Sequence, residues 1–333
     1  MLHTAHFYVK LTSDEVRKLE NKFHTTITLI LNQAENKFSG VKINIQKKEQ
    51  TNMWFIYTFI DFIELLQKND GVITENDYSE VNTKLQDLED FLFDSTEKFI
   101  LLRIDYRLDV IVEEPNMRKL LISLYDKLSE KHRFQKKCNI DSKTQDKYKT
   151  TLYFNSKSIN TVVYDKEQER NDKKEPIKTY EHNVLRFEVR LHNKHLLNMR
   201  SKKHRAKTLE QYFKHSLWKE YMLKYVQEVF FLGDFYTIYH AKKIINESNL
   251  KTREKTQLIK FLKDISFLGM ENIKSWTEKN QNKTRDSLYS RPTIRKYIKL
   301  LSELNINPIL IPKNKKNAPS KLKNPLQDLQ TKY

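Results

Sequence analysis

Hydrophobic and polar residues alternate along several segments of the chain, a spacing that predicts β-strands with one buried face. In residues 102–110, apolar side chains alternate with two arginines and two aspartates, so one face of the predicted strand is entirely charged. In residues 185–191, apolar side chains alternate in the same way with two arginines and a glutamate. Further strands are predicted at 6–11, 41–46, 53–59, 150–154 and 160–166.

Other segments have the spacing of amphipathic helices. Thr12 followed by Glu15 has the sequence of a capping box, which predicts a helix to about Phe23. A charged loop is expected over 167–181, and the pattern becomes wholly helical after His192. Helices are predicted over 75–93, 117–131, 209–231 and 235–245.

This order of elements predicts an α+β fold, with a mainly antiparallel sheet and flanking helices, followed by an all-α, helix-turn-helix-like C-terminal part. We expect a sheet-based domain over 1–195 and a helical domain over 205–312, divided at the basic run 199–207. The Lys-, Asn- and Pro-rich tail over 313–333 is expected to be disordered.

The composition excludes several classes of site. Only 4 of the 333 residues are glycine, and no glycine-rich loop of the kind that holds nucleotide phosphates is present. Cys138 is the only cysteine, so the chain forms no internal disulfide and no thiolate zinc site. No apolar run approaches the ~20 residues of a membrane span, and no signal peptide is recognised. A cytoplasmic protein without a membrane partner is expected.

The charge is concentrated at one end of the chain. Residues 1–100 contain 11 Lys+Arg and 16 Asp+Glu. Residues 193–333 contain 30 Lys+Arg and 12 Asp+Glu, and this difference equals the net charge of +18 of the whole chain. Such a surface attracts a polyanion, and nucleic acid is favoured over a membrane surface.

The basic segments contain candidate DNA-binding residues. Ser290 and Pro292 have the pattern of a helix start, and the helix that follows presents basic side chains after a helix expected from Thr252. This order is typical of a helix-turn-helix, although a helical bundle with a solvated basic face has the same pattern. The candidate DNA-binding residues are Arg291, Arg295, Lys296, Lys299, Lys202, Lys203 and Arg205.

Two groups of residues suggest chemistry on the sheet. Tyr164, at the end of a predicted strand and near Lys166, has the chemistry of a nucleophile for a phosphodiester. Because the chain contains 17 tyrosines, its spacing alone favours an ordinary strand tyrosine. Asp105, Asp109 and Glu188 would project from one face if their strands are neighbours. Carboxylates suit Mg²⁺ or Mn²⁺, but arginines on the same faces could neutralise them in cross-strand ion pairs. No histidine is assigned to a metal.

Three central segments, at 152–158, 163–170 and 184–191, together resemble the replication initiation proteins of rolling-circle plasmids, the Rep_trans family, which are related to the initiators of filamentous phages. Residues 102–109 are similar to the strand motif that precedes them in the family. The resemblance covers about residues 100–195. Asn155 stands where many relatives have glycine, and the acidic first 100 residues match no part of the family.

The resemblance implies a nicking and joining enzyme whose tyrosine stays linked to the 5′ end of the cut DNA strand. It assigns the nucleophile to Tyr164 and a phosphate-holding role to Lys166, with Asp105, Glu188 and Glu169 as ligands of Mg²⁺ or Mn²⁺. This interpretation requires the Tyr164 ring to lie within reach of the acidic strands and outside the protein interior.

The implied function is rolling-circle replication initiation, in which the protein binds a double-stranded origin, nicks a single strand and leaves a 3′-OH primer. The expected partners are origin DNA, single-stranded DNA, a second copy of the chain, and the host helicase and polymerase. The alternative is a non-catalytic, sequence-specific DNA-binding regulator. A mobilisation relaxase is disfavoured because the chain lacks a His-x-His pair.

Overall fold

A computed structural model of the chain describes residues 1–93, 99–128, 135–140, 147–274, 288–315 and 318–327. Its central feature is an eight-stranded sheet with the order β2-β3-β1-β4-β8-β7-β6-β5, in which every neighbouring pair is antiparallel. The strands are β1 Leu2–Thr12, β2 Val41–Lys48, β3 Met53–Asp61, β4 Ile100–Ile111, β5 Gln135–Ile140, β6 Lys147–Asn155, β7 Ile159–Asp165 and β8 Val184–His192. The predicted α+β class is confirmed.

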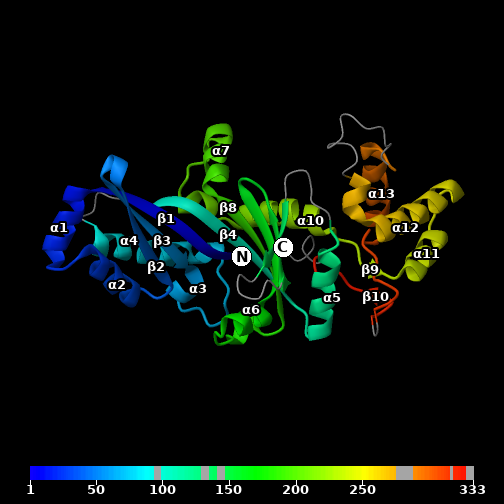
Figure 1. Cartoon of the computed structure of the whole chain (residues 1–333), viewed down its shortest axis with the longest axis horizontal. Coiled ribbons are helices and arrows are strands. Elements are labelled where there is room, and N and C mark those ends of the chain that lie inside the picture. The colour runs from blue at the N-terminus through cyan, green and yellow to red at the C-terminus, as the bar shows by residue number, and fades with distance from the viewer. Residues whose placement is uncertain (94–98, 129–134, 141–146, 275–287, 316–317, 328–333) are drawn as a thin grey trace.

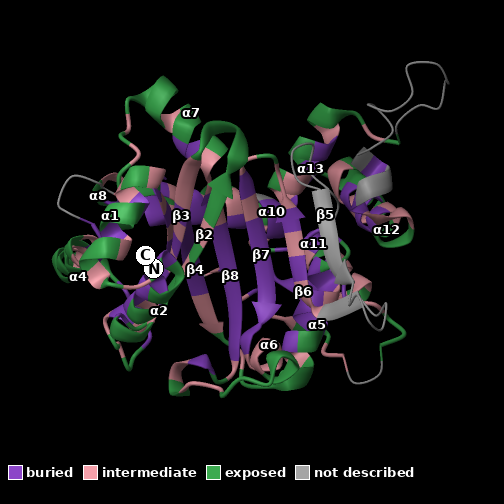
Figure 2. Ribbon diagram, turned by 60° about the vertical axis from the view of Figure 1, so that its left-hand side comes forward, coloured by how far each residue is buried: buried purple, intermediate pink, exposed green. Residues whose placement is uncertain are grey.

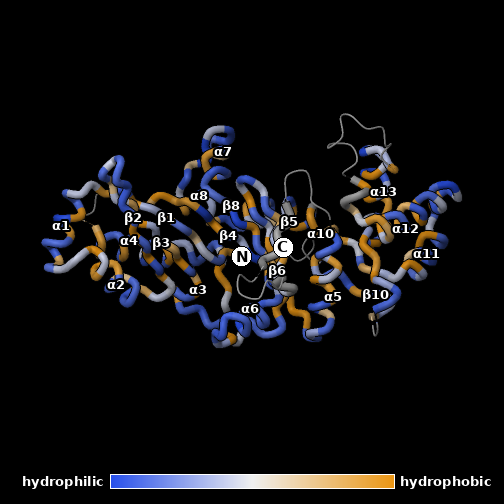
Figure 3. The backbone as a smooth tube through the Cα atoms, in the orientation of Figure 1, coloured by the Kyte–Doolittle hydropathy of each residue, from blue (hydrophilic) through white to orange (hydrophobic). Residues whose placement is uncertain are grey.

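The two faces of the sheet differ in chemistry. Opposite residues in an antiparallel pair share a face, so the register of each pair assigns every side chain. One face is apolar and holds residues such as Leu101, Ile104, Phe187 and Leu191. The other face carries the charged residues of β4 and β8. Figure 3 shows the alternation of hydrophobic and hydrophilic residues along the strands, and Figure 2 shows that the central strands are largely buried.

Helices from two parts of the chain cover the apolar face. In the N-terminal half, Val9, Ile56 and Ile60 of the sheet belong to one core with Ile30 and Leu88 of the helices. At this end of the molecule the helices thus form a layer on one side of the sheet (Figure 1). The helices here are α1 Ser13–Phe23, α2 Ile27–Lys37, α3 Phe62–Leu65 and α4 Tyr78–Leu92; two 3₁₀ turns, η1 Glu49–Thr51 and η2 Glu75–Asp77, lie between them.

The second half of the apolar face is covered by α5 Pro115–Tyr125 and by the segment 209–230. The rings of Tyr125, Phe187 and Phe230 meet edge to face, with centroids 4.8–5.8 Å apart. Tyr106 stacks on Tyr221 at 5.6 Å. These contacts join a late segment of the chain to the sheet.

The expected single helix over 209–231 is wrong. The segment contains α8 Leu209–Tyr212, α9 His215–Met222, a π-helical stretch at Leu223–Gln227 and α10 Glu228–Phe230. Tyr106 donates to the carbonyl of Tyr212, and Trp218 donates to the carbonyl of Arg107. The helical breaks let these aromatic side chains follow the surface of the sheet. The expected division at 199–207 therefore separates residues that share one core.

Helices α11 Ile238–Glu247, α12 Thr252–Lys274 and α13 Arg291–Glu303 lie at the other end of the molecule, beyond α5 (Figure 1). α12 bends at Gly269, which has a positive φ of 81°. Ser290 caps α13 by accepting from the amide of Thr293. The sequence pattern with Ile273 and Trp276 predicts a short helix after this bend, but Trp276 lies outside the described residues.

The disorder expected for the tail is wrong for residues 318–327. β10 Lys321–Leu322 pairs with β9 Phe235–Tyr236, and the side chain of Leu326 is buried. Asn324 holds the segment in place, because its amide donates to Asp234 and its side chain donates to two carbonyls, those of Phe231 and Gly233. The sequence pattern failed here because the tail is fixed by polar contacts rather than by apolar periodicity.

Other local expectations fare unevenly. The capping box of Thr12 and Glu15 is present and α1 ends at Phe23, as predicted. α2 was not predicted. The expected charged loop over 167–181 begins instead with α6 Lys166–Lys173, which is capped by Asp165. η3 Thr179–Glu181 precedes β8, and helix α7 Asn193–Lys203 follows it. No helix in the described part of the chain has the length and apolarity needed to cross a membrane.

We expect Thr12→Ala to lower the free energy of unfolding by about 1 kcal/mol, because it removes the side-chain oxygen that caps α1. Thr26→Ala is the matched control, since Thr26 is the exposed N-cap of α2 but makes no side-chain cap hydrogen bond. Urea unfolding of both variants measures the difference. Equal effects at the two sites would contradict the assignment of the cap.

Candidate active site

Tyr164 is the penultimate residue of β7 and is held there by the residue that follows it. Asp165 caps α6 through the amide of Gln168 and accepts from Arg118 Nε at 2.8 Å. Arg118 also contacts Glu167 and the carbonyl of Val112. The end of β7 is therefore tied to α5 and α6, which determines where the Tyr164 ring lies.

Tyr164 lies on the charged face and reaches the neighbouring strand. Its Oη donates to Glu188 Oε1 at 2.6 Å. The ring is only 6 % exposed, but it lies outside the hydrophobic core cluster of the protein. Tyr164 therefore lies within reach of an acidic strand, as the nucleophile interpretation requires. The interpretation also requires the ring to be accessible to DNA. In this conformation it is not, because polar groups enclose the phenol.

Burial and the neighbouring carboxylate keep this phenol protonated. Burial, followed by the negative charge of Glu188, raises the pKa of Tyr164 well above its ordinary value, and the charges of Arg186 and Arg190 oppose this rise. Burial also disfavours ionisation of Glu188, but Arg190, His3 and Arg186 outweigh it and hold its pKa well below the ordinary value. The pair is therefore a neutral phenol donating to a carboxylate.

Arginines neutralise the carboxylates of β4 and β8. Arg186, which is fully buried, makes a two-fold hydrogen bond to Asp109 at 2.7 and 2.8 Å. Arg190 donates to Glu188 Oε2 at 2.6 and 2.9 Å. Arg186 and Asp109 thus form a cross-strand ion pair of the kind that the alternative interpretation anticipated, whereas Arg190 and Glu188 pair within β8. The face that carries these pairs is largely buried rather than solvated.

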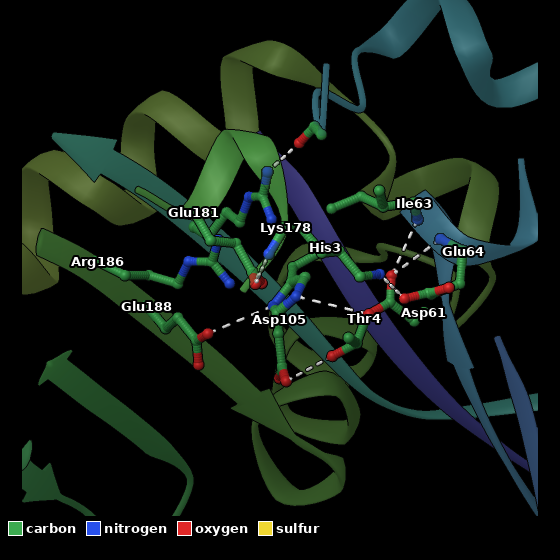
Figure 4. A network of polar contacts seen from close by, with 12 residues as sticks. His3, Thr4, Asp61, Ile63, Glu64, Asp105, Lys178, Glu181, Arg186 and Glu188 are labelled. Atoms are coloured by element: carbon green, nitrogen blue, oxygen red, sulfur yellow. Dashed lines mark hydrogen bonds and ion pairs between the residues drawn. The ribbon is translucent and has the colours of Figure 1, made fainter. Parts of the chain in front are cut away.

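Figure 4 shows how the N-terminal end of β1 enters this network. His3 lies between two carboxylates, with Nδ1 3.3 Å from Glu188 Oε1 and Nε2 3.8 Å from Asp61 Oδ2. Thr4 donates to Asp105 Oδ2 at 2.7 Å. His3 and Asp61 were not predicted as site residues, because each has a local pattern typical of an ordinary strand residue.

The predicted metal ligands do not form a metal site in this arrangement. Both oxygens of Asp105 accept from Arg103, at 2.7 and 2.5 Å, and both oxygens of Glu188 accept hydrogen bonds as described above. Glu169 accepts from Lys166 at 2.7 Å and pairs with Lys173. Within the described residues, no group of three or more His, Cys, Asp or Glu side chains could hold an ion. The donors therefore do not fit Mg²⁺ or Mn²⁺ while their cations stay in place.

Lys166, the predicted partner of Tyr164, is close to it but engaged elsewhere. Its Nζ lies 5.9 Å from the centre of the Tyr164 ring. The same ammonium contacts Glu169 at 2.7 Å and Glu181 at 3.4 Å. Burial, and next the charge of Arg186, lowers its pKa, while Glu169 and Glu181 oppose the change.

Arg107 was not predicted as a site residue, and it has unused hydrogen-bonding capacity. It is 5 % exposed, contacts Asp109 at 3.6 Å and donates to the carbonyl of Gly71. Its Nη1 is buried and has no hydrogen-bond partner among the described residues. A buried guanidinium nitrogen without a partner in the protein can donate a hydrogen bond to a bound anion, such as a phosphate.

The predicted DNA-binding residues fall into two separate groups. Arg291, Arg295, Lys296 and Lys299 are all exposed on α13, where Lys296 pairs with Glu254 of α12 at 2.7 Å. Lys202 and Lys203 are exposed in the last turn of α7. Arg205 differs, because its guanidinium lies 5.6 Å from the Tyr212 ring centre. The helix-turn-helix and its DNA contacts stay a prediction.

Comparison with known proteins identifies the part of the chain that contains this site. Residues 75–229 match a phage family model that describes the N-terminal part of a replication-associated protein. The central part of the chain resembles phage replication-associated proteins. The match confirms the predicted resemblance to replication initiators, on the phage side of that relationship. It covers somewhat less than half of the 333 residues and contains β4, β7 and β8 with Tyr164.

A solved structure gives a much weaker similarity. The rolling circle replication initiator protein from Geobacillus stearothermophilus is 13% identical, over 59% of this chain and 76% of that chain, with a TM-score of 0.28. Similarity at this level carries no argument about the site. No curated protein sequence matches the chain.

We expect Glu181→Gln to destabilise the protein at pH 7, by at most ~3 kcal/mol, and to have a shrinking effect as the pH falls. Burial disfavours the charge of Glu181, but Arg170 and Lys166 outweigh it and lower its pKa to about 2. A lowered pKa stabilises the fold at pH values above 4.5, and this contribution disappears between pH 4.5 and pH 2.

Urea unfolding between pH 7 and pH 3 measures this difference. Glu175→Gln is the control, because Glu175 contacts the same Arg170 from a more exposed position. A difference between wild type and Glu181→Gln that does not change with pH would contradict the assigned role of Glu181.

Proposed function

We propose that the protein is a rolling-circle replication initiator that nicks one DNA strand with Tyr164. The hydrogen bond between Tyr164 Oη and Glu188 Oε1 carries this proposal, because it joins the candidate nucleophile to a proton acceptor on a charged sheet face. The similarity of residues 75–229 to phage replication-associated proteins supports it.

In the proposed reaction, Tyr164 Oη attacks the phosphorus of the scissile phosphodiester. The bond from phosphorus to O3′ breaks as the bond from phosphorus to Oη forms. The phenol proton passes to Glu188, and the departing O3′ takes a proton from water to become the 3′-OH. The products are a 5′-phosphotyrosine and a primer end. The phosphate stays esterified, so a later 3′-OH can reverse the step and close a circle.

Cations around Tyr164 would stabilise the charge that develops on the phosphate. Arg186 and Arg190 act electrostatically on Tyr164, and Arg107 adds a guanidinium with a free Nη1. Fixed charges in a buried site act more strongly than the same charges in water. We assign the direct phosphate contact to Arg107, whose Nη1 has no partner among the described residues, rather than to Lys166, which is paired with two glutamates.

Access to Tyr164 requires movement of the segments that enclose it. His3 contacts Glu188 from β1, and the loop with Gly71 contacts Arg107. A single strand of DNA that brings a phosphate to Oη would compete for Arg107 and for the arginines that pair with the carboxylates. We propose that the DNA itself opens the site by replacing these polar contacts.

The remaining parts of the proposal concern partners and the metal. The basic residues of α7 and α13 would bind origin DNA, and a second copy of the chain would supply a second tyrosine for termination. The host helicase and polymerase would use the nicked strand. The requirement for Mg²⁺ or Mn²⁺ stays a prediction, and no step is assigned to the ion.

We expect Tyr164→Phe to abolish nicking of a supercoiled plasmid that carries the replication origin, with unchanged DNA binding, because only the nucleophilic oxygen is lost. Tyr153→Phe is the matched control. Tyr153 lies on the same face, on β6, with its ring 5.9 Å from the Arg190 guanidinium. The assay follows the conversion of supercoiled to relaxed circles with protein attached, in Mg²⁺ or Mn²⁺ and in chelator.

Wild-type nicking by Tyr164→Phe would exclude this mechanism. Specific origin binding without nicking by the wild-type protein, in either metal, would favour the alternative of a DNA-binding regulator. Nicking that persists in chelator would show that the arginines suffice without a divalent ion.

A further inference from the structure

The charged face of the sheet continues into an aromatic surface on β1 and β3. The register places Tyr8 opposite Tyr57 and His6 opposite Phe59, on the same face as Thr4 and Asp105. The side chains of His6, Tyr8, Tyr57 and Phe59 are half-buried, and so is that of Phe55 on the same face. We call the set Tyr8, Phe55, Tyr57 and Phe59 the aromatic surface.

Three of these rings lie nearly parallel to one another. The centre of the Phe55 ring is 6.4 Å from Tyr8 and 6.3 Å from Tyr57, with interplanar angles of 20° and 16°. The rings of the hydrophobic core, in contrast, lie under helices. The aromatic rings of β1 and β3 therefore form a row on one face of the sheet, where they stay partly exposed.

Cations accompany these rings although the first 100 residues are acidic in total. Lys10 and Lys48 place their Nζ atoms 5.7 and 4.6 Å from the centre of the Phe55 ring. Lys207, which follows α7, lies 5.7 Å from the Tyr8 ring. α4, on the other side of the sheet, carries four carboxylates and one lysine. Of the residues that β1, β2 and β3 place on this face, all of them described, Asp61 is the only carboxylate.

We propose that the aromatic surface binds single-stranded DNA by stacking bases on its rings, with the lysines at the phosphates. This inference rests on the proposed nicking function and adds a binding site to it. Aromatic rings interleaved with cations are the chemistry by which proteins hold unpaired nucleotides. A duplex does not fit, because its bases are already stacked on one another. The aromatic surface lies before residue 75, outside the segment that resembles the phage proteins.

The distance from the aromatic surface to Tyr164 determines how many nucleotides would lie between them. β3 and β7 are separated by β1, β4 and β8, so four strand spacings, or ~19 Å, lie between them. A stacked strand advances ~3.4 Å per nucleotide, so about six nucleotides span this distance. The face between them carries Arg103 and Arg190. The aromatic surface would thus hold the strand a fixed number of nucleotides from the phosphate that Tyr164 attacks.

The test measures binding of a fluorescent single strand of about 20 nucleotides, longer than the roughly 4–16 that one binding fold covers. Phe55→Ala should weaken binding by about 5- to 150-fold, the range for the loss of one base–aromatic stack, whereas Phe55→Trp should preserve it. Tyr239→Ala is the control, because Tyr239 is an aromatic residue of α11 that is 72 % exposed. Binding of the matching duplex should not change in Phe55→Ala.

A second readout locates the contact directly. Oligonucleotides that contain 5-iodouracil form photo-crosslinks with nearby aromatic side chains, and we expect the crosslinked peptide to contain residues 53–59. Unchanged single-strand affinity in Phe55→Ala, together with crosslinks elsewhere, would overturn the proposal. If Phe55→Ala changes the protein from dimer to monomer in sedimentation but leaves its DNA affinity unchanged, a second copy of the chain covers this face instead, and the proposal is overturned.

Failure of this proposal is distinguishable from failure of the nicking function. If Tyr164→Phe loses nicking but Phe55→Ala binds single strands normally, only the aromatic surface is excluded. If Phe55→Ala loses single-strand binding but wild-type protein never nicks, the aromatic surface is a DNA-binding site without the enzyme.

Discussion

The structure depends on the pairing of arginines with carboxylates along one face of β4 and β8. An isolated charge buried in a protein is strongly destabilising, so the buried Arg186 and Glu188 are tolerable there only with Asp109 and Arg190 beside them. The pairing also creates the chemical environment of Tyr164. The phenol donates to a carboxylate whose pKa is lowered, amid guanidinium groups that face the same space. Stability of the sheet and organisation of the site therefore come from the same residues.

The same pairing constrains what the site can do. Carboxylates that accept from arginine have few oxygen lone pairs left for a cation, which is why the ligands expected for Mg²⁺ or Mn²⁺ do not form a metal site within the described residues. DNA phosphates, in contrast, are alternative partners for the arginines. On this account, substrate binding and the opening of the network are one event, because each phosphate oxygen that takes a guanidinium releases a carboxylate.

The sequence predicted the sheet face well because strand periodicity is a local property. The alternation in residues 102–110 and 185–191 assigned Asp105 and Glu188 to the charged faces of their own strands, and the pairing of β4 with β8 brings these faces together. The contacts made by His3, Asp61 and Arg107 were not predictable, since each depends on which strands become neighbours. The segment 209–230 was misassigned for a related reason: its aromatic spacing fits a helix, but its breaks are imposed by packing on the sheet. The ordered tail depends on Asn324, whose polar contacts leave no periodic signal.

The central claim is that Tyr164 becomes the covalent link to DNA. It is tested most directly by incubating wild-type protein with a supercoiled plasmid carrying the origin, digesting the DNA and the protein, and locating the nucleotide adduct by mass spectrometry. The account predicts a phosphonucleotide on the peptide that contains Tyr164. An adduct on another tyrosine, such as Tyr153, or a nicked circle without attached protein, would contradict it.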